Sequence, residues 1–324
     1  MHYLLRRIRH AVFLLVGVSL FTFLLTTLAP GNYFDEMRLN PQLAPETLQA
    51  LRTKYQLDRP LPVRYAEWVK SVLRGDLGFS FTYNTPVAPL LWLRARNTLL
   101  LTATAVLLAW AISLPVGMWS ANHRGKLSDR WLSWIVAALL VIPELTLALG
   151  LLVFAVRTGW LPAGGMTSMS FESLRWPGKV RDVAIHMILP VTVLVLGALP
   201  VLLRHVRSAL IDVLDAPFLR AAEGHGIPRH RLLYRYALPA AANPLISLFG
   251  FSVGTLLSAS LLVEIVTSWP GLGPFLVEAI LARDLYVVLA GVLLSTVFLV
   301  GGNLAADLLL YWVDPRIRAG LDSR

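Results

Sequence analysis

Long apolar stretches alternate with short polar ones along nearly the whole chain. A helix needs roughly 20 apolar residues to cross the hydrocarbon core of a bilayer, within a range of about 17–25. Six stretches meet that length, so the pattern predicts an all-α polytopic membrane protein with six transmembrane helices. The predicted spans cover residues 11–29, 98–121, 131–156, 186–203, 240–266 and 285–311.

Prolines lie inside several of these spans, among them Pro115 in the second, Pro143 in the third, and Pro190 and Pro200 in the fourth. Proline removes a backbone donor and kinks or breaks a helix. In membranes it is tolerated where neighbouring helices satisfy the freed carbonyl groups. We therefore expect a break at Pro143, and the two prolines of the fourth span weaken its helical prediction.

Composition agrees with a membrane protein. Hydrophobic residues make up 56% of the 324 residues and charged residues 15%, whereas soluble domains carry about 25% charged residues. The chain has no cysteine, which excludes disulfides and thiolate metal sites. Because Arg6, Arg7 and Arg9 precede the first span, a cleaved signal peptide is the alternative there; the long apolar run and the absence of an A-x-A site disfavour it.

The distribution of basic residues predicts the orientation. With a cytoplasmic N-terminus, 15 of the 29 Lys and Arg fall on 68 cytoplasmic residues and 14 on 114 outer residues. This excess is the positive-inside pattern, which places both termini in the cytoplasm and needs no nucleic-acid partner. The predicted parts are 1–29, the cytoplasmic N-terminus and first helix; 30–97, an extracytoplasmic segment; 98–311, a core of five helices; and 312–324, a cytoplasmic tail.

The extracytoplasmic segment carries two patterns of short amphipathic helices, at residues 46–57 and 62–73. It is too short for an independent binding domain. We expect these helices to help receive a solute-binding protein, with packing on the outer face as the alternative.

The longest predicted cytoplasmic loop, 204–239, ends in RAAEGHGIPRHRLLYRYALP (220–239). It is far longer than a helix–helix connection requires. Ala221 and Ala222 give a surface without side-chain bulk, and arginines flank them. These features indicate a surface that docks on another protein.

Within this loop, residues 212–223 are expected to form a short helix capped by Asp212 or Asp215. Gly226 permits a turn with positive φ. A second short helix, 229–237, then leads into the fifth span. The prediction is a helix–turn–helix that stands off the membrane.

The same loop resembles the cytoplasmic signature of ABC importer permeases, and within them the dipeptide and oligopeptide branch. The positions that match its spacing are Ala221, Ala222, Gly226, Leu238 and Pro239, while Arg220 replaces a Glu and Tyr236 an Ile. Four further stretches are similar to that branch and occur in its order: LAPGN (28–32), residues 57–81, SWPGLG (268–273) and VDPRIR (313–318). The resemblance covers nearly the whole chain.

The resemblance implies a type I ABC importer transmembrane domain in the plasma (cell inner) membrane. Such a subunit forms the path for peptides or related small solutes, and its loop, here 212–239, couples it to ATPase subunits. The implied partners are a homologous second permease in a heterodimer, two ATPase subunits and an extracytoplasmic solute-binding protein.

The chain itself has no G-x-x-x-x-G-K-[ST] and no nucleophile–base constellation. We therefore predict no enzymatic activity, no cofactor and no metal site in this chain; ATP is bound by the partner subunits.

Three carboxylates fall within or at the ends of spans, where ionisable groups are costly and mark water-filled paths. We expect Glu144, which follows Pro143, to line the translocation path and attract an amine; the alternative is a buried, protonated Glu. Glu264 is a candidate for the outer gate, with interfacial solvation as its alternative, and Asp307 is expected to be structural. An ion-coupled secondary transporter that uses these three carboxylates is the alternative function.

The stretch SWPGLG contains a turn-forming Pro-Gly and is expected at the outer surface as a re-entrant or capping loop. Its candidate residues are Trp269, Pro270, Gly271 and Gly273, and an amphipathic helix is expected to follow at 274–283. Gly250 and Gly254 permit close helix packing, either within the chain or with the partner permease.

Overall fold

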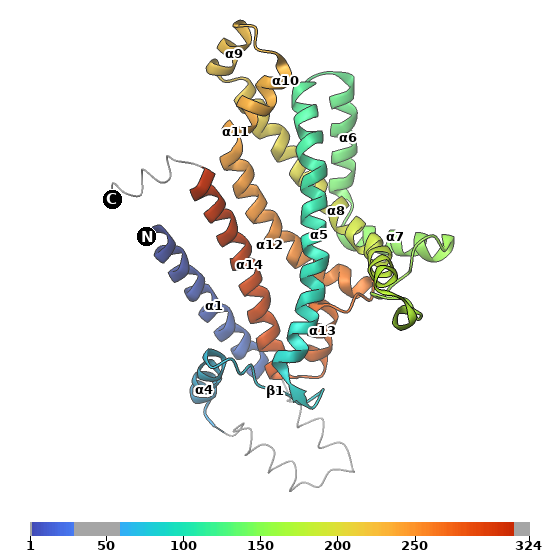
Figure 1. Ribbon diagram of the computed structural model, residues 1–324. Helices are drawn as coiled ribbons and strands as arrows, with labels where there is room; N and C mark the ends of the chain where they lie inside the picture. The colour runs from blue at the N-terminus through green and yellow to red at the C-terminus, as the bar shows by residue number, and fades with distance from the viewer. Residues whose placement is uncertain (1, 29–58, 314–324) are drawn as a thin grey trace. The chain divides into compact units, whose positions relative to one another are not determined.

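The computed structural model describes residues 2–28 and 59–313, with side chains from Arg6 onward (Figure 1). Helices make up nearly all of the described chain. They are α1 (His2–Leu28), α4 (Leu61–Leu73), α5 (Val87–Asn122), α6 (Leu127–Val141), α7 (Glu144–Thr158), α8 (Trp176–Leu214), α9 (Pro217–Gly224), α10 (Arg229–Arg231), α11 (Leu238–Ala240), α12 (Ala242–Val266), α13 (Leu272–Leu281) and α14 (Leu285–Val313). A 3-10 turn at Phe171–Ser173, a π-helical turn at Leu232–Ala237, and the strands β1 (Phe79–Ser80) and β2 (Thr85–Pro86) complete the elements.

Several sequence expectations fall outside these residues. They are the helix at 46–57, the part of LAPGN after Leu28, and the part of VDPRIR after Val313. The helix expected at 62–73 is present as α4, and the one expected at 274–283 is present as α13, which begins two residues earlier.

The chain forms two compact units. Among the described residues, the first comprises residues 3–28, 59–97 and Pro270–Val297, and the second comprises Thr98–Trp269 and residues 298–313. Helices α5 and α14 each contribute to both units.

In the first unit, α1 packs on α4 and the start of α14. Phe23 is 2% exposed and its ring lies 5.4 Å from that of Tyr65, whose hydroxyl is 2.8 Å from the Ser19 hydroxyl. Trp68 and Leu289 complete this apolar cluster. The first predicted span is therefore packed against its neighbours in this unit.

A two-residue antiparallel hairpin, β1–β2, also belongs to the first unit and pairs Phe79 with Pro86 and Ser80 with Thr85. It is tied to the start of α14 by Asp284, which is fully buried. This carboxylate accepts hydrogen bonds from the Ser80 hydroxyl at 2.6 Å and from the Thr82 amide at 3.1 Å. The sequence patterns did not predict this hairpin.

The second unit is built around α8, a single helix of 39 residues that contains Pro190 and Pro200. The helix predicted at 186–203 is confirmed, although its two prolines weakened that prediction. Both prolines are buried, because α6, α7 and α12 pack around α8, and the helix continues through positions where two backbone hydrogen bonds are missing. The helix also extends 11 residues beyond the predicted end of the span.

The third predicted span is not one straight helix. Helices α6 and α7 meet at an angle of 96°, and Pro143 occupies the position before the first residue of α7. The expected break at Pro143 is confirmed. Five described helices are long and apolar enough to cross a membrane, and the bent pair makes up to six.

The glycines of α12 face α14 within the second unit. A Cβ on Gly250 would lie 2.4 Å from the Cβ of Ala306, and one on Gly254 would lie 2.4 Å from Leu299 Cδ1. From the other side, a Cβ on Gly302 would meet Val253 at 2.6 Å. Of the two alternatives for Gly250 and Gly254, packing within the chain is what the structure shows.

Candidate functional site

The first candidate site is the 215–241 segment, which contains α9, α10, the π-helical turn and α11. Helix α8 ends at Leu214 where the Asp215 amide donates to the Ile211 carbonyl at 3.0 Å. The single helix expected at 212–223 is therefore wrong at its start: residues 212–214 complete α8, and α9 begins at Pro217. Neither expected aspartate caps α9, since the residue before it is Ala216 and makes no side-chain cap.

Gly226 makes the turn that follows α9. Its φ of +77° lies in the left-handed region, which a residue with a Cβ enters only at a cost of about 1–2 kcal/mol. Its amide donates to the Glu223 carbonyl at 2.9 Å, and the Ile227 amide donates to the Ala222 carbonyl at 3.4 Å. The predicted positive-φ turn is confirmed.

Arg229 fixes the next helix against its neighbours. It donates to Asn122 Oδ1 at 2.6 Å and to Glu223 Oε1 at 3.1 Å, so this arginine is engaged within the chain. The second predicted helix, 229–237, is present as α10 and the π-helical turn, which continue through Leu238 and Pro239 in α11. π-Helical turns occur frequently at functional sites.

One face of the segment is an apolar anchor on the ends of α5, α8 and α12. The cluster contains Leu219, Leu232, Leu233 and Ala237 from the segment, and Met118, Ala121, Val206, Leu210, Ile211, Ala241 and Leu245. Leu219 is 2% exposed and Ala237 fully buried. Because apolar burial of this kind is worth about 1.5–3 kcal/mol for each large side chain, the segment is held firmly on three long helices.

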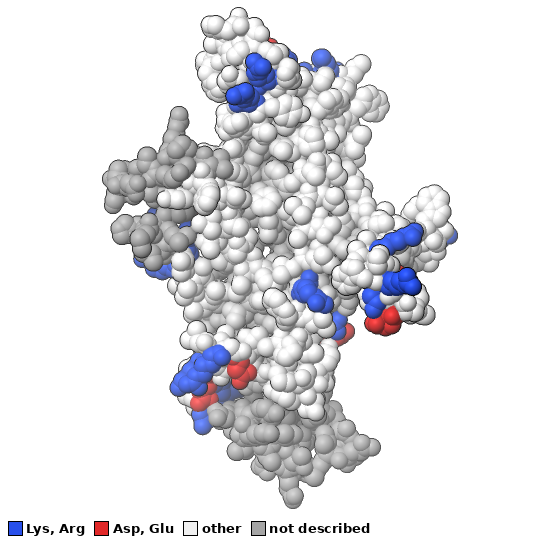
Figure 2. Space-filling model, viewed as in Figure 1, with Lys and Arg blue, Asp and Glu red and all other residues white. Residues whose placement is uncertain are grey.

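The opposite face of the segment is exposed and carries basic side chains (Figure 2). Aromatic side chains lie there as well. Phe218 is 54% exposed and Tyr234 63% exposed. Arg220, Ala221 and Ala222 lie on α9: the first two are exposed, and Ala222 is half-buried against the anchor. The segment thus presents an exposed, cationic surface, and its opposite face is anchored in the apolar cluster. Such a surface suits docking on a protein that carries acidic groups.

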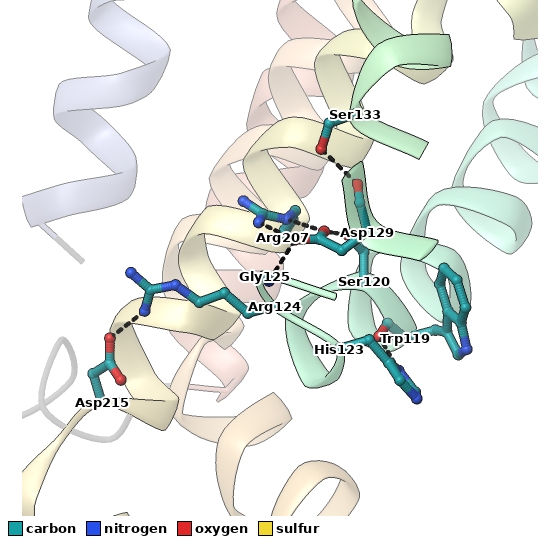
Figure 3. A network of polar contacts seen from close by, with 9 residues as sticks. All are labelled: Trp119, Ser120, His123, Arg124, Gly125, Asp129, Ser133, Arg207 and Asp215. Carbon is teal, nitrogen blue, oxygen red and sulfur yellow. Dashed lines mark hydrogen bonds and ion pairs between the residues drawn. The ribbon is translucent and has the colours of Figure 1, made fainter. Parts of the chain in front are cut away.

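A polar network holds α6 to α8 near this segment (Figure 3). The Arg207 guanidinium donates to both oxygens of Asp129, at 2.8 and 2.7 Å. Asp129 also accepts from the Ser120 hydroxyl at 2.6 Å and the Gly125 amide at 3.1 Å. An exposed pair, Arg124 with Asp215 at 2.7 Å, lies beside it.

The sequence patterns missed this network. Asp129 and Arg207 are 78 residues apart, and nothing in the spacing of either one points to the other. The available signal was an acid at the start of a predicted span, next to a basic loop.

Glu144, the candidate path residue, is the first residue of α7 and follows the exposed Pro143. It is half-buried, and its Oε1 lies 3.4 Å from where a Cβ on Gly197 of α8 would stand. It makes no hydrogen bond or ion pair with the residues that the structure describes. A cavity of about 250 Å³ opens nearby; its lining comprises Gly117, Ser120, Leu132, Ser133, Val136, Ala137, Leu140, Pro200, Leu203, Arg204 and Arg207.

The remaining candidates lie deeper than expected. Glu264 in α12 is fully buried, so its predicted alternative of interfacial solvation is wrong. Trp269 is also fully buried, and its amide donates to the Glu264 carbonyl at 2.9 Å. Gly271 and Gly273 are buried in the first unit, where the Pro270 carbonyl accepts from Asn97 at 2.9 Å. The turn is therefore packed into the chain, and its place at the outer side as a re-entrant or capping loop stays a prediction.

The described residues contain no group of three or more His, Asp or Glu that is placed to hold a metal ion. Asp307 is half-buried in α14.

Comparison with known proteins agrees with this architecture. Residues 113–319 match the family described as "Binding-protein-dependent transport system inner membrane component", and residues 1–102 match its N-terminal companion family. The chain is 33% identical over 317 residues to the oligopeptide transport system permease protein AppB of Bacillus subtilis, covering 97% of this chain and 98% of that protein. It is 32% identical over 336 residues to the dipeptide transport system permease protein DppB of Escherichia coli K12, covering 98% and 99%.

The fold is similar to that of the MetNI methionine ABC transporter in an inward-facing conformation. The TM-score is 0.57 at 21% identity, over 69% of this chain and 96% of the other. Because the family match extends over most of the chain and includes the 215–241 segment, the chain belongs to the family of binding-protein-dependent transport system inner membrane components.

Proposed function

We propose that this chain is the permease subunit of an ATP-driven importer of peptides, and that the 215–241 segment couples it to the ATPase subunits. The single observation that carries the proposal is that the two faces of that segment differ. Its apolar face is anchored on α5, α8 and α12, while its other face is exposed and cationic. The peptide substrate is supported by the two permease relatives, which are named for oligopeptide and dipeptide transport.

The proposed assembly has a homologous second permease as a heterodimer partner, two ATPase subunits that bind ATP, and an extracytoplasmic solute-binding protein. Both termini and the 215–241 segment lie on the cytoplasmic side, as the positive-inside pattern favours. The ion-coupled alternative has no support from the family match.

In the proposed mechanism, closure of the ATPase subunits moves the exposed face of the segment. The apolar cluster passes this motion to the ends of α5, α8 and α12, because close-packed side chains transmit displacement rather than absorb it. The helices then reorient, so that the cavity between α6 and α8 opens first to one side of the membrane and then to the other. This chain supplies the translocation path and the coupling segment 215–241, and ATP hydrolysis takes place on the partner subunits.

The test is Ala221→Trp, scored by co-purification of the ATPase subunit with the detergent-solubilised permease. Ala221 is exposed on α9, so the indole disturbs a docked partner and leaves the anchor cluster intact. We expect wild type to retain the ATPase and the variant to lose it.

The matched control is Lys126→Trp, which adds the same side chain to the exposed loop between α5 and α6. We expect this variant to retain the ATPase. If Ala221→Trp binds ATPase as well as wild type does, the 215–241 segment is not the docking surface.

A further inference from the structure

The cavity between α6 and α8 is lined by two arginines as well as by apolar side chains. Its apolar wall comes from Leu132, Val136 and Leu140 of α6 and from Pro200 and Leu203 of α8. Arg204 and Arg207 of α8 also line the cavity. Arg207 is neutralised by its bidentate pair with Asp129. Arg204 is exposed and makes no ion pair with the residues that the structure describes, so its charge is available to a ligand.

The same face of α8 also meets an acidic residue, Glu144, just beyond the residues that line the cavity. Glu144 lies against Gly197, three residues before the cavity-lining Pro200. Gly197 and Arg204 are seven residues apart on α8, which is within about 20° of two full helical turns, so both lie on one face. An ionisable side chain at this depth in a membrane protein, without a hydrogen bond to the described residues, is a functional-site hypothesis by default.

The axial separation of Gly197 and Arg204 along α8 gives the approximate length of a ligand that reaches from Glu144 to Arg204. Seven residues of α-helix rise about 10.5 Å, which is the length of roughly three extended peptide residues at 3.3–3.6 Å each. The cavity volume of about 250 Å³ lies just below the range of roughly 300–1,000 Å³ for small-molecule sites. The separation matches a short ligand with an amine at one end and a carboxylate at the other, and the small volume disfavours a longer one.

We propose that the α6–α8 groove selects short peptides by their two free termini, with Glu144 attracting the N-terminal ammonium and Arg204 the C-terminal carboxylate. This inference rests on the proposed function of peptide import. The inference names the residues that recognise the substrate, and it predicts a preference for peptides of two or three residues. Charge-assisted hydrogen bonds to the termini hold the ends, and the apolar wall accommodates side chains without choosing among them.

The test uses the complete transporter in proteoliposomes, with its own binding protein. The probes are trialanine, N-acetyl-trialanine and trialanine amide. For each probe the half-saturating concentration for uptake is measured in wild type, Arg204→Gln and Glu144→Gln. The binding protein is the same throughout, so its own preference cancels when the ratio of blocked to free peptide is compared between variants.

We expect Arg204→Gln to weaken trialanine about tenfold or more, the value of one charge-assisted contact. It should also abolish the discrimination against the amide while keeping that against the acetylated peptide. Glu144→Gln should abolish the discrimination against the acetylated peptide while keeping that against the amide. Arg204→Lys, which keeps the positive charge, should retain most of the wild-type preference.

If both Gln variants weaken all three probes equally, the two residues act in structure or in binding a lipid headgroup, and the inference is overturned. Unchanged ratios in well-assembled variants overturn it as well. If the wild-type transporter assembles and hydrolyses ATP but moves no trialanine, peptide import itself is wrong, and the inference fails with it.

Discussion

The guanidinium of Arg207 in α8 is hydrogen-bonded to both carboxylate oxygens of Asp129 in the first turn of α6, at 2.8 and 2.7 Å. The Asp129 side chain is 5% exposed and that of Arg207 is 32% exposed. Asp129 is therefore a buried charge whose main partner comes from another helix. The pair joins α6, which borders the cavity, to the end of α8 from which the 215–241 segment continues.

Loss of one partner of this pair should be costly. Arg207→Ala leaves Asp129 buried and unpaired, and we expect the free energy of unfolding to fall by about 3 kcal/mol, the lower end of the range for such pairs because Arg207 is partly exposed. The measurement is thermal unfolding of the detergent-solubilised protein.

The matched control for that variant is Arg124→Ala, which breaks the neighbouring pair with Asp215. Both partners there are more than half exposed, so the loss should be below about 1 kcal/mol. Equal losses in the two variants would mean that the Asp129–Arg207 pair does not fasten α6 to α8.

The contact between α12 and α14 gives a second prediction. Gly250→Ala would bring two Cβ atoms, its own and that of Ala306, to 2.4 Å, and neither can rotate away because both are fixed to backbone. We expect a destabilisation of about 1–3 kcal/mol, as for overpacked cores, read from the thermal midpoint.

The control for Gly250→Ala lies on α14 itself. Gly301 has nothing within 4 Å of its Cβ position, so Gly301→Ala should leave stability unchanged or raise it by up to about 1 kcal/mol through helix propensity. A Gly250→Ala protein as stable as wild type would show that the two helices have room to separate.

The sequence allowed the long helices to be predicted because apolar length alone identifies a membrane span. It also allowed the turn at Gly226 to be predicted, since glycine next to a short helix indicates positive φ locally. Both features depend on residues close together in the chain. Pairings between distant residues, such as Arg207 with Asp129 or Asp284 with Ser80, were not predictable, because no local pattern specifies them.

Tertiary packing also bears on two local features. Pro190 and Pro200 weakened the prediction of a helix at 186–203, yet α8 continues through both, and α6, α7 and α12 pack around it. Pro-Gly predicts a turn after α12, and the structure adds that Trp269 is part of the apolar core of the second unit. Such burial depends on residues far apart in the chain, which no local pattern specifies.

Tyr83 gives a prediction about pH in the first unit. Burial, together with its hydrogen bond to Glu278, raises the pKa of Tyr83 from its ordinary value to about 12. An acid with a raised pKa in the folded state contributes stability that is fully present below the unfolded pKa, and that stability is lost as the pH rises through the folded pKa. The stability of wild type should therefore decline between about pH 10 and 12, and the part due to this residue should be absent in Tyr83→Phe. A tyrosinate absorbance titration of both proteins checks the assignment, and a difference spectrum that titrates near pH 10 would contradict it.

The final prediction concerns the turn that holds α9. Gly226→Ala places a Cβ at φ +77°, where nothing lies within 4 Å of it, so the cost is backbone strain alone, about 1–2 kcal/mol. That cost should weaken the Ile227–Ala222 and Gly226–Glu223 hydrogen bonds and raise amide exchange across α9, while α8 and α12 stay protected. Gly224→Ala is the control, because Gly224 also has open space around it but has no positive φ; its exchange should match wild type. If exchange in Gly226→Ala increases throughout the second unit, the segment is part of that unit's cooperative fold. If it increases in α9 alone, the segment opens locally while the long helices stay folded. A segment that binds and releases a partner requires this behaviour.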